Sequence, residues 1–399
     1  MITVTTAIEK ILSTVQPVGS TSLELSACIG RVLLEPVYAD RDLPPYHRVT
    51  MDGIAIAYAS FYSGNRHFPI QSTQQAGMPQ QSLAQADHCI EVMTGAMLPK
   101  GTDTVIRYED LEIAEGVAEI NLQADQLTLR QNVHGQGEDR SKGSLLIPTG
   151  RRFSPAEIAL AASTGHSQLT VNRFPQVGVF SSGDELIPIE QKPLPQQIRQ
   201  SNGHMIQAAL ASWGIPSTIM HVPDQREAIR KGLEQLLAEK DALILSGGVS
   251  MGKADFLPRV LEELGVEKHF HKVAQRPGKP FWFGMQGPKP VFGLPGNPVS
   301  TFVNFIRYVL PWMRAAMGES LPTAEYAELA EPVNFPSNLT YFLQVRLESQ
   351  SDGRLLAWPQ KGNGSGDHAN LLNGQAWMEL PQERNDFSAG ESFPIWRYR

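Results

Sequence analysis

The sequence contains only two cysteines, Cys28 and Cys89, among 399 residues, and they lie far apart. A disulfide framework or a thiolate zinc site needs more cysteines at closer spacing, so neither is indicated. Ten histidines are present, but they do not gather into a metal-ligand pattern or a Ser–His–acid arrangement.

The chain also lacks an excess of basic residues, with 34 Lys and Arg against 41 Asp and Glu and a net charge of −7. No general attraction to nucleic acid or anionic lipid follows from this balance. No uncharged apolar stretch reaches the roughly 18 residues of a membrane span, and the first residues do not read as a signal peptide. The sequence therefore predicts a cytoplasmic protein that binds neither nucleic acid nor membrane.

Two glycine-rich nucleotide-binding patterns are missing as well. The absence of GxGxxG at the first strand–helix turn counts against a nicotinamide dehydrogenase, and the absence of GxxxxGK[ST] counts against the common nucleotide hydrolases.

The chain does have the composition of a globular protein, with 41% hydrophobic and 19% charged residues. The region 173–318 alternates strand and helix patterns, which predicts a doubly wound, mostly parallel α/β domain with helices on both faces. Its last helix is expected to run from Pro298 through Met317, with Asn297 as N-cap. The other predicted domains are a discontinuous helical or linker domain (1–21 and 142–172), an irregular β-rich domain (22–141) and a C-terminal β-barrel (319–399).

Three loops of the α/β region, FSSGDEL, SGGVSMGKAD and LPGNPVS, combine glycines with polar side chains. Each follows an apolar strand, and the carboxyl ends of parallel strands meet at one sheet edge, where ligands bind. Successive amides at such turns and helix starts favour phosphate or another oxyanion. Tight turns and helix caps would explain any one of these loops, but three of them favour a ligand groove. The candidates are Ser182, Gly183, Asp184, Ser246, Gly247, Gly248, Ser250, Asp255, Pro295, Gly296, Asn297, Pro298 and Ser300.

Charged residues supply two further features. Arg276 and Lys279 flank a rigid Pro-Gly turn, a pair that suits phosphate or a tetrahedral oxyanion, although solvated surface cations are the alternative. Asp52 and Asp139 have no helix to cap and are candidates for Mg²⁺, which takes few carboxylates and completes its shell with phosphate and water. For Asp224 and Asp255, helix capping is the leading alternative.

Taken together, eight motifs in order resemble those of one family: VTMDGIAI, VMTGAMLPKGTDTVI, GEDRSKG, FSSGDEL, SNGHMIQA, LSGGVSMGKADF, RPGKPFWFG and FGLPGNPVSTFVNF. The chain resembles the MoeA family of molybdopterin molybdenumtransferases, which includes the E-domains of gephyrin and the plant Cnx proteins. The resemblance covers the whole chain and is dense from about 40 to 316.

This resemblance implies a molybdopterin-binding, MogA-like α/β domain and a role in molybdenum cofactor biosynthesis. Adenylylated molybdopterin and molybdate would be the substrates, and the molybdenum cofactor and AMP the products, with Mg²⁺ or another divalent cation assisting. It also implies a homodimer whose active site is shared between subunits, and suggests the molybdopterin adenylyltransferase as a partner.

Residue by residue, the resemblance implies catalytic roles for Asp52, Thr94, Asp139, Glu185 and Lys279. Asp52, Asp139 and Glu185 would hold the metal. The loop residues named above would bind substrate, together with Asp224, Arg276, Lys279 and Ser365.

Several positions depart from the family pattern and thin the positive charge expected near the anion. Val49 and Thr50 replace the usual Ser-Ala before MDG, the arginines before GED are missing, and Arg276 replaces a lysine. Leu339 and Gln344 stand where arginines are common, and Ala369 and Asn370 where serines are frequent. One alternative is therefore a catalytically weak or non-catalytic paralogue that binds molybdopterin or nucleotide, or acts as a scaffold. Another is a generic phosphoryl-transfer enzyme.

Overall fold

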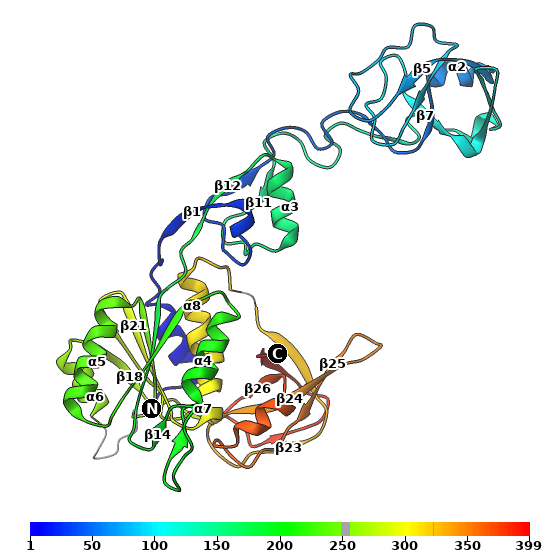
Figure 1. Cartoon of the computed structure of the whole chain (residues 1–399). Helices are drawn as coiled ribbons and strands as arrows, with labels where there is room; N and C mark the ends of the chain where they lie inside the picture. The colour runs from blue at the N-terminus through cyan, green and yellow to red at the C-terminus, as the bar shows by residue number, and fades with distance from the viewer. Residues whose placement is uncertain (249–255, 322) are drawn as a thin grey trace. The chain divides into compact units, whose positions relative to one another are not determined.

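The computed structural model describes residues 1–248, 256–321 and 323–399, which form two compact units (Figure 1). Unit 1 comprises Met1–Leu34, Thr149–Ser154 and Gln168–Arg399, and unit 2 comprises Glu35–Pro148 and Pro155–Ser167. Two predicted site residues, Ser250 and Asp255, lie outside the described residues. No helix in the described part of the chain has the length and apolar character needed to cross a membrane.

The main sheet of unit 1 has six strands, and its first four run parallel in the order β16-β13-β17-β21. Only β20 is antiparallel to its neighbours β21 and β18. The predicted doubly wound, mostly parallel sheet is confirmed. Its strands are β13 (Val177–Ser182), β16 (Ser217–Val222), β17 (Ala242–Ser246), β18 (Glu267–His271), β20 (Trp282–Gln286) and β21 (Lys289–Leu294).

Helices cover both faces of this sheet because its buried strands are apolar on both sides. Along β17, Leu243 and Leu245 pack into one core while Ala242 and Ile244 pack into the other, as strand alternation requires. Figure 1 shows α5 and α6 on one face and α4 and α8 on the other. The helices of unit 1 are α1 (Val4–Leu12), α4 (Asn202–Ala211), α5 (Arg226–Glu239), α6 (Leu257–Glu263), α7 (Pro298–Asn304) and α8 (Leu310–Ala316).

The helix predicted from Pro298 through Met317 is not continuous. A π-helical turn, η4 (Phe305–Val309), separates α7 from α8. Pro311 explains the interruption, because proline has no N–H to donate and its ring clashes with the carbonyl four residues earlier.

Five strands of unit 1 close into a small barrel in the order β24-β25-β22-β28-β26, with β26 returning to β24. The predicted C-terminal β-barrel is confirmed. The short strand β19 (Gln275–Arg276) pairs in parallel with β24 and so ties the Arg276 turn to the barrel. The barrel strands are β22 (Glu325–Leu329), β24 (Thr340–Ser349), β25 (Leu355–Pro359), β26 (Ala376–Leu380) and β28 (Ser392–Arg397). Two-stranded pairs complete unit 1: β1 (Ser20–Glu24) with β12 (Gln168–Asn172), β14 (Leu186–Ile187) with β15 (Ile198–Arg199), and β23 (Val333–Asn334) with β27 (Asp386–Phe387).

Unit 2 is built around another six-stranded sheet in the order β7-β4-β6-β5-β9-β8. Its strands are β4 (Gly53–Ile56), β5 (His67–Gln74), β6 (Cys89–Val92), β7 (Thr104–Arg107), β8 (Leu111–Ala114) and β9 (Val117–Ile120). The unit adds α2 (Tyr58–Tyr62), α3 (Pro155–Ser163) and two short pairs, β3 (Arg48–Val49) with β10 (Val133–His134) and β2 (Val37–Tyr38) with β11 (Leu145–Ile147). The predicted presence of an irregular β-rich domain is confirmed, while its bounds at 22–141 stay a prediction.

Candidate active site

The predicted glycine-rich loops of unit 1 meet at one edge of the main sheet. Ser182 is level with Val222, and Ser246 is level with both Ser181 and Leu294, so β13, β16, β17 and β21 all end there. β16 and β17 lie on opposite sides of β13, which makes this edge a topological switch point. Open α/β sheets bind their ligands at such points.

Direct contacts hold these loops together. The Asn202 side chain donates from Nδ2 to Ser246 Oγ at 2.9 Å and to the Gly296 carbonyl at 2.7 Å. Gly248 has a φ of +66°, and a Cβ there would lie 3.6 Å from Ser182 Oγ and 2.3 Å from Leu257 Cδ1. Glycine suits position 248, because it tolerates this φ and leaves room for the Leu257 side chain.

The acidic residues at this edge are exposed to solvent. The Asp224 amide donates to Asp184 Oδ1 at 3.1 Å, which joins the loops after β16 and β13. The N-cap position of α5 is occupied by Gln225, one residue beyond Asp224. The Glu185 carboxylate folds back over Gly183, and a Cβ at position 183 would lie within 2.9 Å of both carboxylate oxygens.

A cavity of about 620 Å³ lies between the Arg276 turn, the start of α7 and the barrel. It contains two cationic residues, Arg276 and Lys279, both exposed, and one acidic residue, Asp367. The predicted residues that line it are Arg276, Lys279, Pro295, Asn297, Ser300 and Ser365. Residues from three distant stretches of the sequence are thus brought together around one space.

Asn297 occupies the N-cap position of α7, but its side chain makes no capping bond. Instead, Nδ2 donates to Ser365 Oγ at 2.7 Å, and the Val299 amide donates to the Ser365 carbonyl at 3.1 Å. These two bonds fasten the Ser365 loop to the helix start and shape one wall of the cavity.

In unit 2, the structure brings Asp52 and Thr94 into contact. Asp52 Oδ1 accepts hydrogen bonds from the Thr94 amide at 2.6 Å and the Thr94 hydroxyl at 2.7 Å. These two bonds lower the pKa of the exposed Asp52 carboxyl below its ordinary value, the amide contributing more than the hydroxyl. The carboxylate is therefore ionised at neutral pH and is held at a fixed place.

Asp139, also in unit 2, has a histidine partner. His134 Nε2 lies 3.0 Å from Asp139 Oδ1, and His134 Nδ1 lies 2.9 Å from Arg48 Nη2. Arginine can only donate, so Nδ1 accepts and Nε2 carries the proton directed at the carboxylate.

Known proteins match the chain along its whole length. Family models for the MoeA N-terminal region (domain I and II), a "probable molybdopterin binding domain" and the MoeA C-terminal region (domain IV) match residues 2–165, 178–315 and 326–398. A molybdopterin molybdenumtransferase from Synechocystis sp. is 37% identical over 401 residues, with 100% of both chains covered. One from Staphylococcus epidermidis is 30% identical and covers 98% of this chain and 94% of that protein. The chain belongs to the MoeA family.

A crystal structure of the MoeA protein from Pyrococcus horikoshii agrees with this assignment. It superposes with a TM-score of 0.82 at 29% identity and covers 100% of this chain and 99% of that one. The family resemblance predicted from the eight motifs is thereby confirmed.

Two of the departures from the MoeA pattern form a hydrogen-bonded pair in the cavity wall. Asn370 donates from Nδ2 to Gln344 Oε1 at 3.1 Å, and Gln344 donates from Nε2 to the Asn370 carbonyl at 2.5 Å. Leu339 lines the same cavity, whereas Ala369 is exposed outside its lining. Gln344 and Asn370 are thus neutral amides that satisfy each other's hydrogen-bonding groups in the cavity wall.

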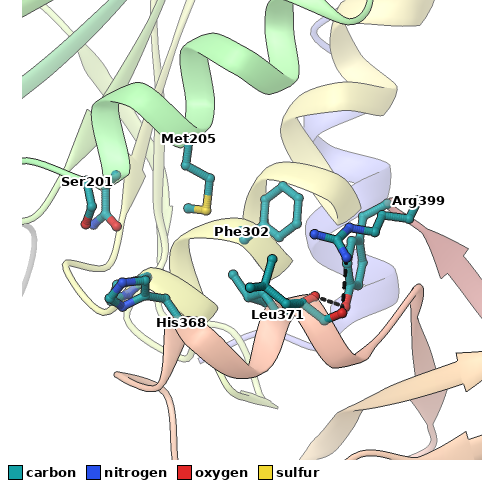
Figure 2. Close-up of a pocket in the computed structure, with 10 residues that line it drawn as sticks. Ser201, Met205, Phe302, His368, Leu371 and Arg399 are labelled. Carbon is teal, nitrogen blue, oxygen red and sulfur yellow. Dashed lines mark hydrogen bonds between the residues drawn. The ribbon is translucent and has the colours of Figure 1, made fainter.

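A second pocket of about 310 Å³ adjoins the sheet edge (Figure 2). It shares Asn202 with the loop contacts described above, and Pro298 is the one predicted site residue in its lining. Figure 2 shows Met205 and Phe302 facing Leu371 across the space. This pocket was not predicted from the sequence, because its walls combine apolar side chains with exposed polar ones that belong to separate parts of the chain.

Removing the Thr94 hydroxyl is expected to raise the pKa of Asp52 toward its ordinary value. In Thr94→Val the amide bond remains and the side-chain bond is lost, so the rise is partial. Asp52 would then become protonated at a higher pH than in the unmodified protein. An NMR titration of the Asp52 carboxyl carbon measures the shift, and Thr73→Val, which removes a hydroxyl bonded to Glu91 instead, is the matched control. An unchanged Asp52 titration would contradict the assigned cause.

Proposed function

We propose that this transferase of molybdenum cofactor biosynthesis inserts molybdenum into molybdopterin. Its substrates are adenylylated molybdopterin and molybdate, and its products are the molybdenum cofactor and AMP. The observation that carries the proposal is the cavity in which Arg276, Lys279, Ser300 and Ser365 converge, in a chain whose full-length relatives bear the name molybdopterin molybdenumtransferase.

Molybdate is a tetrahedral dianion, and the cavity offers donors suited to it. Arg276 supplies a planar guanidinium and Lys279 a compact ammonium, while Ser300 and Ser365 add hydroxyl groups. Asp367 is the one acid in the lining, and its Oδ2 accepts from the Asn363 amide at 3.0 Å. The molybdate is therefore bound in this cavity.

The pterin and its phosphates bind along the neighbouring sheet edge. The glycines at Gly183, Gly248 and Gly296 let anionic oxygens approach the backbone there. The Gly247 amide is not one of the donors, because it donates to the Leu294 carbonyl at 3.1 Å. Asp52, ionised and held by Thr94, positions the water that attacks the phosphoanhydride and accepts its proton. Asp139, oriented by His134, is the second acid that we assign to this reaction.

The participation of Mg²⁺ that the sequence predicted stays a prediction. Among residues 1–248, 256–321 and 323–399, no three His, Cys, Asp or Glu side chains are grouped so that they could hold a metal ion. Asp52, Asp139 and Glu185 therefore make no preassembled metal site in the part of the chain that is described, and their role as ligands stays a prediction.

The proposal includes a homodimer in which Asp52 and Thr94 of one subunit complete the cavity of the other. Mixing Asp52→Asn and Lys279→Ala subunits in equal amounts tests it at limiting molybdate, where Lys279→Ala alone is nearly inactive, since each mixed dimer would contain one intact site. Random pairing makes half of the dimers mixed, so about a quarter of the unmodified activity should return. Each variant re-mixed with itself is the control, and no recovery after subunit exchange would contradict a shared site.

The molybdopterin adenylyltransferase, which makes the adenylylated substrate, is the proposed partner.

Molybdate-dependent release of AMP from adenylylated molybdopterin is the decisive assay. Purified protein should release AMP only when molybdate is added. AMP release that ignores molybdate would favour a generic phosphoryl-transfer enzyme. A non-catalytic paralogue would release none, but the full-length relatives named as enzymes do not favour this alternative.

A further inference from the structure

Three buried polar side chains form a hydrogen-bond network directly behind the turn that carries Arg276 and Lys279. Gln275, Asn304 and Tyr308 all have 0% of their surface exposed. Tyr308 donates its hydroxyl to Gln275 Oε1, and Gln275 Nε2 donates to Asn304 Oδ1 at 2.8 Å. Burying three polar groups is costly unless each is bonded, and here they satisfy one another.

The network is attached to the backbone of the turn at two successive carbonyls. Gln275 Nε2 also donates to the Pro277 carbonyl at 3.0 Å, and Asn304 Nδ2 donates to the Gly278 carbonyl at 3.1 Å. Gly278 has a φ of +89°, and a Cβ there would lie only 2.8 Å from Asn304 Nδ2. The turn therefore rests against the network without room for a side chain, and both of its middle residues are held in place.

Two of the three network residues come from the helical segment that packs behind the turn. Asn304 ends α7 and Tyr308 lies in the π-helical turn η4 that follows. Single π-turns inside α-helices are often found at functional sites. On the other side, the pairing of β19 with β24 holds Gln275 level with Thr340 and Arg276 level with Tyr341. The turn is thus fixed both from the α/β domain and from the barrel.

We propose that Gln275, Asn304 and Tyr308 are positioning residues that set the separation and direction of Arg276 and Lys279 for binding molybdate. The inference rests on the proposed function, in which the cavity beside the turn binds this anion. Arg276 and Lys279 are like charges on one short turn, and their repulsion favours its opening when no anion is bound. The network opposes that opening, so that the cations are already in position when molybdate enters.

Two variants separate this role from general stability. Asn304→Leu keeps the branched shape of the side chain but removes its bonds to the Gly278 carbonyl and from Gln275 Nε2. Tyr308→Phe removes a single hydroxyl and serves even if Asn304→Leu fails to fold. Isothermal titration calorimetry with sodium molybdate, well below the unfolding temperature, gives the dissociation constant. We expect it to rise roughly tenfold in Asn304→Leu and severalfold in Tyr308→Phe. In the AMP-release assay, the KM for molybdate should rise while kcat at saturating molybdate stays near the unmodified value.

The matched control is Thr14→Val, which removes the bond from Trp312 Nε1 to Thr14 Oγ1 near the other end of the same helical segment. It should lower the unfolding temperature without changing molybdate affinity. If both network variants bind molybdate as the unmodified protein does while Lys279→Ala does not, the positioning role is wrong and the proposed function stands. If the unmodified protein itself binds no molybdate, both are wrong.

Discussion

Asp52→Asn is expected to abolish AMP release, with a rate loss of roughly a hundredfold to ten-thousandfold, the usual contribution of a positioned general base. Asparagine has nearly the same shape, and its Oδ1 still accepts both hydrogen bonds from Thr94. The substitution therefore removes the charge and the proton acceptor but keeps the local geometry. AMP measured by chromatography after incubation with adenylylated molybdopterin and molybdate gives the rate.

The control for this variant is Asp87→Asn, in the same unit. Asp87 is another exposed carboxylate whose pKa is lowered by a hydrogen bond, in its case from His88. It belongs to none of the predicted motifs, so its replacement should leave turnover unchanged. Both variants should keep the circular dichroism spectrum and unfolding temperature of the unmodified protein. Normal turnover in Asp52→Asn would remove Asp52 from the mechanism.

Regular strand–helix alternation made the architecture of the α/β domain predictable. The loops after β13, β17 and β21 were placed at one edge because parallel strands share a direction, and the register of Ser182, Ser246 and Leu294 places them there. The contact of Asp52 with Thr94 joins two motifs that the sequence had singled out separately. The three loops could be predicted from local sequence features: an apolar strand, a glycine, and a polar residue where the strand ends.

What the sequence did not predict depends on contacts between distant residues that carry no charge. Asn202 lies in the SNGHMIQA motif and was given no role of its own, yet its side chain joins two loops. Gln344 and Asn370 were interpreted only as departures from the family pattern, and their mutual hydrogen bonds were not predicted. Neutral amides suit caps, turns and surfaces equally well, so only their three-dimensional neighbours identify their role.

The helix after Asn297 has the predicted extent but contains an irregularity that was not predicted. Local propensity predicted one continuous helix, but Pro311 removes a backbone donor inside it and the chain adopts a π-turn. That turn contains Tyr308, which reaches the buried Gln275. Pro311, which interrupts the regular helix, thereby helps to place Tyr308 behind the turn that carries Arg276 and Lys279.

Lys279→Ala should weaken molybdate-dependent activity most strongly when molybdate is scarce. The cavity contains two cations and one acid, so each positive charge supplies a large share of the attraction for the anion. Hydrogen bonds to a charged group contribute about 1.5–3 kcal/mol, which predicts a rise in the KM for molybdate of roughly ten- to a hundredfold.

Saturating molybdate should recover most of the rate in Lys279→Ala, because a binding cation lost from the ground state can be offset by concentration. Rates of AMP release measured over a wide range of molybdate concentrations separate KM from kcat. Lys268→Ala is the matched control, since Lys268 is an exposed lysine of unit 1 whose ammonium lies 3.8 Å from Glu262 Oε1. An equal loss of rate at every molybdate concentration would instead assign Lys279 to the chemical step. Because molybdate binding by Lys279 depends on charge, added salt should raise the KM of the unmodified protein more than that of Lys279→Ala.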